Sequence, residues 1–146
     1  MERVTLSPAS CKPVDILART LWGEAREDSV RGKEAVAAVV VNRVRHARAG
    51  RAVWWGRTIP DVCLKPDQFS CWSTPSGGCP DAMAVLLDDP CLAVCVRIAR
   101  RAVAGVLEDP TGGATCYHAR SVHPRWAWSR IPSAEIGEHI FYTIVE

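Results

Sequence analysis

Apolar positions recur at helical spacing in three stretches of this chain, separated by loops rich in proline, glycine and tryptophan. The first stripe contains Ile16, Leu17 and Leu21 and predicts a helix that begins near Val14 or Asp15. Gly23 is a stop signal near its end. Residues 1–13 contain two prolines and no such stripe, so we expect an irregular N-terminal arm there.

The second stretch is apolar around most of its girth, which is typical of a central helix. Asp28 or Ser29 can cap it, and Gly50 ends it. The third stretch has Asp89 as a cap, Pro90 at its first position and Gly105 past its end. Between these two helices we expect short helical segments at residues 59–64 and 81–87.

Two segments near the C-terminus have the character of strands, residues 115–117 and 138–145. In the second, Ile140 and Tyr142 alternate with Phe141 and Thr143. Helices that precede a small antiparallel sheet predict an α+β fold. The length of 146 residues fits one domain, which we place at residues 14–146.

Composition limits the class of protein. The net charge of +2 is too small to indicate nucleic-acid binding. The chain has no run of 18 apolar residues, so a membrane span is not expected. The N-terminus has no apolar segment of a Sec signal peptide, so the protein is expected to start in the cytoplasm. Of seven cysteines, an odd number, at least one stays unpaired in a monomer.

Glu24 stands out as a candidate acid, because it lies at the C-terminal end of the first predicted helix. The helix dipole disfavours an anion there by roughly 0.3–1 kcal/mol. Burial against Trp22 or Trp72 would add a desolvation cost, and both effects favour the protonated carboxyl that a general acid needs. An exposed glutamate at a helix end fits the same pattern. Glu27 is expected to be solvated and Asp28 to cap the next helix, which favours one catalytic acid over a pair.

The segment "DQFSCW" offers an amide, a hydroxyl and an indole, which together suit a sugar: Gln68, Ser70 and Trp72. Trp72 could equally be a core plug under a loop. A second segment, "ATCYHARSVHPRWAW", adds further candidates for substrate binding, Tyr117 and His118 above all, with His123, Trp126 and Trp128. Six tryptophans, mostly in predicted loops, favour a carbohydrate groove, although tryptophan also serves in surface packing.

A metal centre is the alternative for the same region, since Cys116, His118 and His123 have the spacing C-x-H-x4-H. The paired blocks of a structural zinc site are missing, as are HExxH, GxSxG and P-loop motifs. A cysteine nucleophile would need a base and an orienting group that the sequence does not identify. We therefore expect neither a metal nor a cofactor.

The blocks "LARTLWGEAR", "GKEAVAAVVVNRV", "PDQFSCW", "DPTGGATCYH" and "IGEHIFY" occur in this order over residues 15 to 143. In this they resemble the SleB-type cell wall hydrolases, the catalytic domain of spore-cortex-lytic enzymes. The resemblance implies a lysozyme-related α+β fold around a central helix. It also implies cleavage between N-acetylmuramic acid and N-acetylglucosamine in peptidoglycan by a lytic transglycosylase, with one carboxyl as acid and base.

The resemblance places the family's catalytic glutamate, in its "GEA" motif, on Glu24. Its QFSxW loop falls on Gln68, Phe69, Ser70 and Trp72, and the tyrosine of its "DPTxGA..Y" block on Tyr117. Members often read "GEARGE", whereas Glu27 and Asp28 stand at the last two positions here. That change leaves the role of the second acid open. Cys63 and Cys71 flank the loop, and a disulfide between them is one expectation.

Many members also carry a signal peptide and a wall-binding domain, and neither is found in this sequence. We therefore expect a protein that reaches the cell wall or periplasm by another route. A lysis protein released through a membrane pore and a component of a phage-like particle both fit. The alternatives are a metal-dependent cell-wall amidase or peptidase, a non-catalytic wall-binding module, and plain lysozyme-like hydrolysis.

Overall fold

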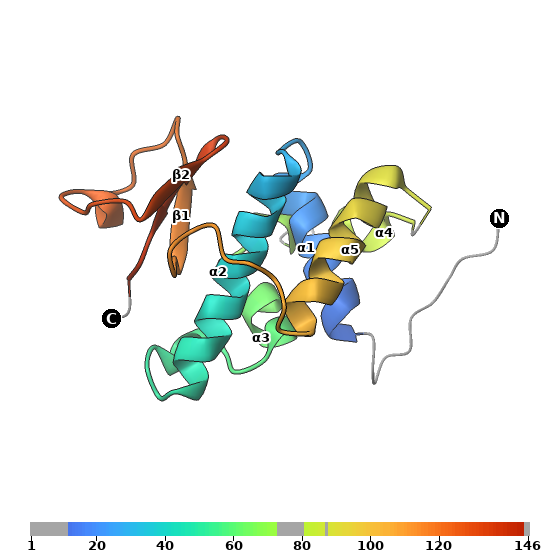
Figure 1. Cartoon of the computed structure of the whole chain (residues 1–146), viewed down its shortest axis with the longest axis horizontal. Helices are drawn as coiled ribbons and strands as arrows, with labels where there is room; N and C mark the ends of the chain where they lie inside the picture. Colours follow the sequence, from blue (N-terminus) through green and yellow to red (C-terminus); the bar gives the residue numbers. More distant parts are fainter. Residues whose placement is uncertain (1–11, 73–80, 87, 145–146) are drawn as a thin grey trace.

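The computed structural model describes residues 12–72, 81–86 and 88–144 (Figure 1). Helices α1 (Lys12–Ala25), α2 (Val30–Arg48), α3 (Ile59–Leu64), α4 (Asp81–Ala84) and α5 (Pro90–Val103) precede the strands β1 (Cys116–Ala119), β2 (Ala134–Ile136) and β3 (His139–Tyr142). Single 3-10 turns occur at η1 (Val53–Trp55), η2 (Ser70–Trp72) and η3 (Arg125–Ala127). The expected order of helices followed by a small antiparallel sheet is confirmed.

The predicted helix ends are mostly confirmed. The α3 segment and the cap of α5 are as predicted, because the Asp89 carboxylate accepts a hydrogen bond from the Leu92 amide at 3.0 Å. Ser29, not Asp28, caps α2, and its hydroxyl accepts from the Gly32 amide at 3.1 Å. The predicted arm is wrong at its last two residues, since α1 already starts at Lys12 and a proline is tolerated in a first turn. Residues 1–11 lie outside the described residues.

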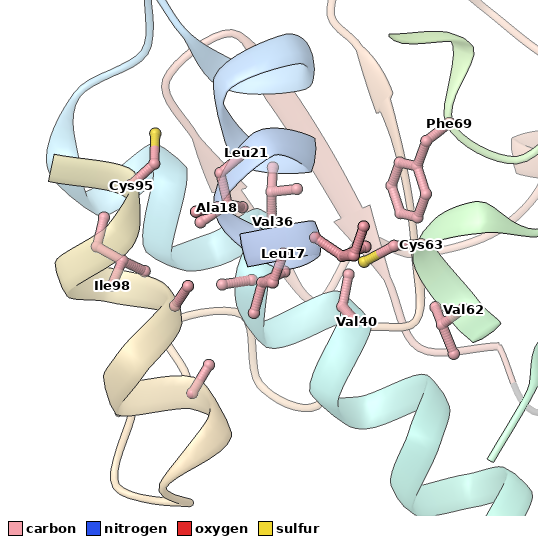
Figure 2. Close-up of a cluster of buried hydrophobic side chains, with 14 of the residues drawn as sticks. Leu17, Ala18, Leu21, Val36, Val40, Val62, Cys63, Phe69, Cys95 and Ile98 are labelled. Atoms are coloured by element: carbon pink, nitrogen blue, oxygen red, sulfur yellow. The ribbon is translucent and has the colours of Figure 1, made fainter. Parts of the chain in front are cut away.

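The main core lies between α1, α2, α3 and α5. Its largest fully buried members include Leu17 and Leu21 of α1, Val36 and Val40 of α2, and Ile98 of α5 (Figure 2). Each such side chain contributes roughly 1.5–3 kcal/mol when taken out of water. These contacts fix α1, and with it the helix end that carries Glu24.

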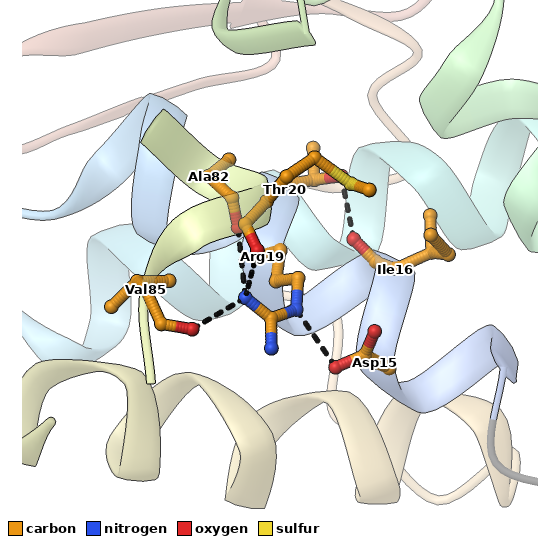
Figure 3. A network of polar contacts seen from close by, with 7 residues as sticks. Asp15, Ile16, Arg19, Thr20, Ala82 and Val85 are labelled. Carbon is orange, nitrogen blue, oxygen red and sulfur yellow. Dashed lines mark hydrogen bonds and ion pairs between the residues drawn. The ribbon is translucent and has the colours of Figure 1, made fainter. Parts of the chain in front are cut away.

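Arg19 of α1 binds the α4 segment to the core (Figure 3). Its Nε donates to the Asp15 carboxylate at 2.9 Å, and its Nη1 donates to the carbonyls of Ala82 at 3.0 Å and Val85 at 2.6 Å. One guanidinium thereby satisfies carbonyl groups that a four-residue helix leaves unpaired. The helix is shorter than the predicted 81–87, and residue 87 lies outside the described residues.

The sheet has the strand order β1-β3-β2 and is antiparallel throughout. Tyr117 pairs with Phe141, and Phe141 is fully buried against Ala35 and Val39 of α2. The β2 strand was not predicted, because three residues with an exposed Glu135 give too short an alternation. Among the described residues, no helix combines the length and the apolar character that crossing a membrane requires.

Candidate active site

Glu24 lies in the last turn of α1, and its half-buried carboxylate has a donor on each oxygen. Oε2 accepts a hydrogen bond from the Cys71 amide at 3.2 Å, and Oε1 accepts one from the Tyr117 hydroxyl at 3.2 Å. The carboxylate is therefore held where a helix end, the η2 turn and β1 meet. The alternative of an exposed glutamate is wrong for this residue, whereas Glu27 is exposed as expected.

The loop before η2 is anchored by aromatic side chains. Phe69 is 3% exposed and packs in the main core (Figure 2). The Trp72 indole Nε1 donates to the Thr20 hydroxyl of α1 at 2.9 Å. Between them Cys71 aims its amide at Glu24. Trp72 thus packs against the core, as one of the two interpretations of the sequence held.

Gly23 makes room for this loop. A Cβ added at Gly23 would lie 2.3 Å from Cys71 Cβ and 2.8 Å from its Sγ, which is too close for any side chain. The glycine that marks a helix stop in the sequence continues the helix here and permits close packing of η2 on α1. Gly23 therefore allows η2 to approach the backbone of α1 closely, and it does not form a turn.

Tyr117 is oriented by two neighbouring rings of β3. His139 meets it edge-on with ring centroids 5.1 Å apart, and Phe141 lies at 5.5 Å. Burial, and then the nearby Glu24 carboxylate, raise the pKa of Tyr117 well above its ordinary value. The phenol therefore keeps its hydrogen and remains a donor to Glu24 over the physiological range of pH.

His118 points to a different group of side chains. Its Nε2 lies 2.9 Å from the Tyr142 hydroxyl, its ring stacks on Tyr142, and Trp126 meets it edge-on. Successive residues of a strand face opposite sides, so Tyr117 and His118 diverge. The structure brings Tyr117 to Glu24 and places His118 against the rings of Tyr142 and Trp126, with which it forms an aromatic cluster.

A cleft of about 580 Å³ opens beside Tyr117. Three predicted binding residues line it, Gln68, Tyr117 and Trp126, while Ser70 is exposed at η2. The other lining residues are Arg43, Trp54, Trp55, Asp67, Cys116, Arg130 and Ile144. Trp54 and Trp126 are 50% and 40% exposed, so part of each indole ring is open to solvent.

Arg43 and the tryptophan pair at residues 54 and 55 were missed in the sequence. Arg43 belongs to the central helix but is only 7% exposed, and its Nε donates to the Thr115 carbonyl at 2.7 Å. Burial lowers the pKa of Arg43, against the opposing influence of Cys116 and Tyr117. The adjacent tryptophans in a loop with glycine were the available signal for this wall of the cleft.

The cysteines are separate thiols in the part of the chain that the structure describes. The predicted Cys63–Cys71 disulfide is not formed, and burial raises the pKa of Cys63 to about 12. Burial and the neighbouring Glu24 also raise the pKa of Cys71. Cys95 is buried in the core, whereas Cys91 is only half-buried. Cys11 and Cys79 lie outside the described residues.

No three His, Cys, Asp or Glu side chains within residues 12–72, 81–86 and 88–144 are grouped to hold a metal ion. In particular, Cys116, His118 and His123 do not form such a group. The metal-dependent alternative therefore lacks the ligand set on which it was based.

The model of a family described as "Cell Wall Hydrolase" matches residues 27–142. The chain belongs to this cell wall hydrolase family. Its fold is that of the catalytic domain of the Bacillus cereus SleB protein, with a TM-score of 0.71 and 26% identity over 92% of this chain and 91% of that one. A solved catalytic domain from Bacillus anthracis, titled a germination-specific lytic transglycosylase SleB, gives a TM-score of 0.68 at 26% identity, over 95% of this chain and all of that one.

Curated relatives of this cell wall hydrolase are named spore cortex-lytic enzymes. The protein from Halalkalibacterium halodurans is 32% identical over 97% of this chain, and that from Bacillus cereus is 28% identical over 88%. The chain spans 38% and 43% of the length of these two relatives.

Proposed function

We propose that this domain cleaves the glycan strands of peptidoglycan as a lytic transglycosylase, with Glu24 as its single acid and base. The observation that carries the proposal is the half-buried Glu24 carboxylate, held by the Cys71 amide and by the hydroxyl of Tyr117, a residue that itself lines a cleft walled by tryptophans. Membership of the cell wall hydrolase family and the names of the similar proteins support the same substrate class.

In the proposed reaction Glu24 first donates its proton to the glycosidic oxygen between N-acetylmuramic acid and N-acetylglucosamine. The bond from that oxygen to C1 of the muramic residue breaks, and N-acetylglucosamine leaves with a free hydroxyl. The ionised Glu24 then accepts the proton of the muramic O6 hydroxyl as O6 bonds to C1. The product has a 1,6-anhydro ring, no water is consumed, and Glu24 regains its proton.

One carboxyl is sufficient for these reaction steps, since O6 of the substrate is the nucleophile. Two-carboxylate glycosidases need a second acid roughly 5–9 Å away across the sugar. Gln68 and Tyr117 line the cleft and are proposed to contact the substrate. Trp72 and Ser70 would act through the η2 turn, and His118 through the aromatic cluster of the sheet.

The test is digestion of purified sacculi by wild type and Glu24→Gln, with mass spectrometry of the released muropeptides. We expect wild type to release fragments with anhydro-muramic ends and Glu24→Gln to release none while keeping its fold. Glu27→Gln is the matched control, because it removes an exposed carboxylate three residues away. Products with reducing muramic ends would replace the transglycosylase by a hydrolase, and full activity of Glu24→Gln would refute the mechanism.

A second part of the proposal concerns the route by which the domain reaches the cell wall. We propose that the domain reaches the wall either through a membrane pore during lysis or within a phage-like particle. Immunodetection of the chain in purified particles would favour the second route. Its appearance only in the fluid of lysing cells would favour the first.

A further inference from the structure

Asp28 and His139 form a pair that joins the helices to the sheet. The Asp28 Oδ2 and His139 Nδ1 atoms are 3.1 Å apart, although their alignment is not that of a hydrogen bond, and the two side chains are only 10% and 14% exposed. Asp28 lies in the turn between α1 and α2, four residues after Glu24, and His139 is the first residue of β3. The pair therefore connects the segment that carries Glu24 to the sheet that carries Tyr117.

From His139 the contacts lead back to Glu24. Tyr117 pairs with Phe141 across β1 and β3, so His139, two residues earlier, lies on the same face of the sheet as Tyr117. The His139 ring meets the Tyr117 ring edge-on at 5.1 Å and 89°. The Tyr117 hydroxyl then donates to Glu24 at 3.2 Å. A series of contacts therefore runs from Asp28 through His139 and Tyr117 to Glu24. The end of α1 and the turn after it connect Glu24 back to Asp28 along the chain.

The turn that carries Asp28 is itself constrained. Lys33 is 6% exposed, and its ammonium donates to the carbonyl of Arg26 at 3.0 Å and to that of Asp28. A Cβ at Gly32 would lie 2.9 Å from Asp28 Cβ, so only glycine leaves the space in which Asp28 sits. The carboxylate is therefore directed toward His139 by the fold around it.

We propose that the Asp28–His139 pair is a positioning device that sets the Tyr117 hydroxyl against Glu24. The Asp28 carboxylate limits the orientation of the His139 ring. The His139 ring in turn packs against Tyr117 on the side that Phe141 does not cover, and so holds the Tyr117 ring in place. This gives a function to an acid that the sequence assigned only to helix capping. The effect expected on turnover rests on the proposed function, whereas the effect on Tyr117 does not.

The first test observes Tyr117 directly. The chain has only two tyrosines, Tyr117 and Tyr142, so the protein labelled with 3-fluorotyrosine gives two ¹⁹F NMR signals, assigned with Tyr142→Phe. In Asp28→Asn we expect the Tyr117 signal to move and the Tyr142 signal to stay. Asp28→Asn is preferred to a change of His139, which would alter the ring next to the label directly.

Glu135→Gln is the matched control, because it breaks an exposed ion pair of the same sheet, with Arg120 at 2.8 Å. Both signals should stay in place in this variant. A Tyr117 signal that is the same in wild type and Asp28→Asn overturns the proposal, even if thermal unfolding shows that Asp28→Asn is less stable.

The second test separates positioning from stability. On soluble glycan strands we expect Asp28→Asn and His139→Gln to lower kcat roughly 10- to 100-fold with little change in KM, since the reacting groups are displaced while the cleft remains. Asp28→Glu, which keeps the carboxylate, should recover part of the loss. A kcat equal to wild type in Asp28→Asn, in an enzyme that Glu24→Gln inactivates, overturns the proposal. If Glu24→Gln stays active, the proposed function fails, and the ¹⁹F comparison still decides the positioning of Tyr117.

Discussion

The Tyr117 hydroxyl lies 3.2 Å from Oε1 of Glu24, although 93 positions separate the two residues in the chain. The Cys71 amide reaches the other oxygen across 47 positions. One side chain at a helix end is thereby fixed by a strand and by a loop. Neither donor is a charged group, so the contacts of Glu24 with Tyr117 and Cys71 are hydrogen bonds and not ion pairs.

Replacing Tyr117 by phenylalanine should lower kcat on glycan strands about 10- to 100-fold. The change removes the donor to Glu24, and hydrogen bonds to charged groups are worth about 1.5–3 kcal/mol. The ring contacts with His139 and Phe141 remain, so the free energy of unfolding should fall by no more than the about 1.5–3 kcal/mol of this one hydrogen bond. The kcat of Tyr117→Phe, in which Glu24 is unchanged, measures the first effect. The midpoint of its urea unfolding measures the second.

Tyr142→Phe is the control for that variant. It removes the other tyrosine hydroxyl, which contacts His118 Nε2 at 2.9 Å and is part of the aromatic cluster. Equal losses of kcat in the two variants would show that the Tyr117–Glu24 contact has no special part in turnover.

Local patterns predicted what depends on neighbours in the chain. The apolar stripe of α1 and the first residues of α5 follow from helical spacing and from the cap and proline at Asp89 and Pro90, although Gly23 does not end α1, which runs to Ala25. The contact between Glu24 and Tyr117 does not follow from such patterns, because it depends on how the sheet docks on α2 through Phe141. The resemblance to a known family indicated both residues, but only the folded structure shows how close they lie to each other. Asp28 was misassigned for the same reason: its partner, His139, is 111 positions away in sequence and its cap position was taken by Ser29.

Thr20→Val should destabilise the protein by about 1–3 kcal/mol. The Thr20 hydroxyl accepts from Trp72 Nε1 and donates to the Ile16 carbonyl at 2.7 Å, so valine leaves a part-buried indole N–H without its partner. Because Trp72 ends the η2 turn, activity should fall as well. Thr20→Ser keeps the hydroxyl and serves as the control in urea unfolding. A valine variant as stable as the serine variant would contradict the assigned contact.

Asp109 should make stability depend on acid pH. Burial raises the pKa of its carboxyl, but hydrogen bonds from Thr111, Asn42 and Gly113 outweigh burial, and the net pKa is lowered from 3.8. The folded protein therefore binds this proton less readily than the unfolded chain, so the stabilisation is complete above the unfolded pKa and is lost as pH falls through the folded one.

Urea unfolding between pH 7 and pH 3 measures this dependence. Asp109→Asn should be less stable than wild type at pH 7, since it replaces an acceptor of four hydrogen bonds that shape the approach to β1. The difference between the two proteins should shrink toward pH 3. Exposed Asp61 offers a control, because Asp61→Asn should give a difference that is small at every pH. A gap between wild type and Asp109→Asn that widens on acidification would contradict the sign of the shift.

Gly23→Ala should inactivate the enzyme by pushing η2 away from α1. In an ordinary helix this change stabilises by up to about 1 kcal/mol, but here the new Cβ would lie 2.3 Å from Cys71 Cβ. Overpacking of this kind costs about 1–3 kcal/mol, and moving Cys71 removes its amide from Glu24. Adding Cys71→Gly clears both clashing atoms and should restore most activity, whereas adding Cys71→Ala keeps the Cβ and should not. Activity on sacculi and urea midpoints of the three variants distinguish these outcomes, and restoration by Cys71→Ala alone would show that the thiol, and not the backbone approach, sets the spacing.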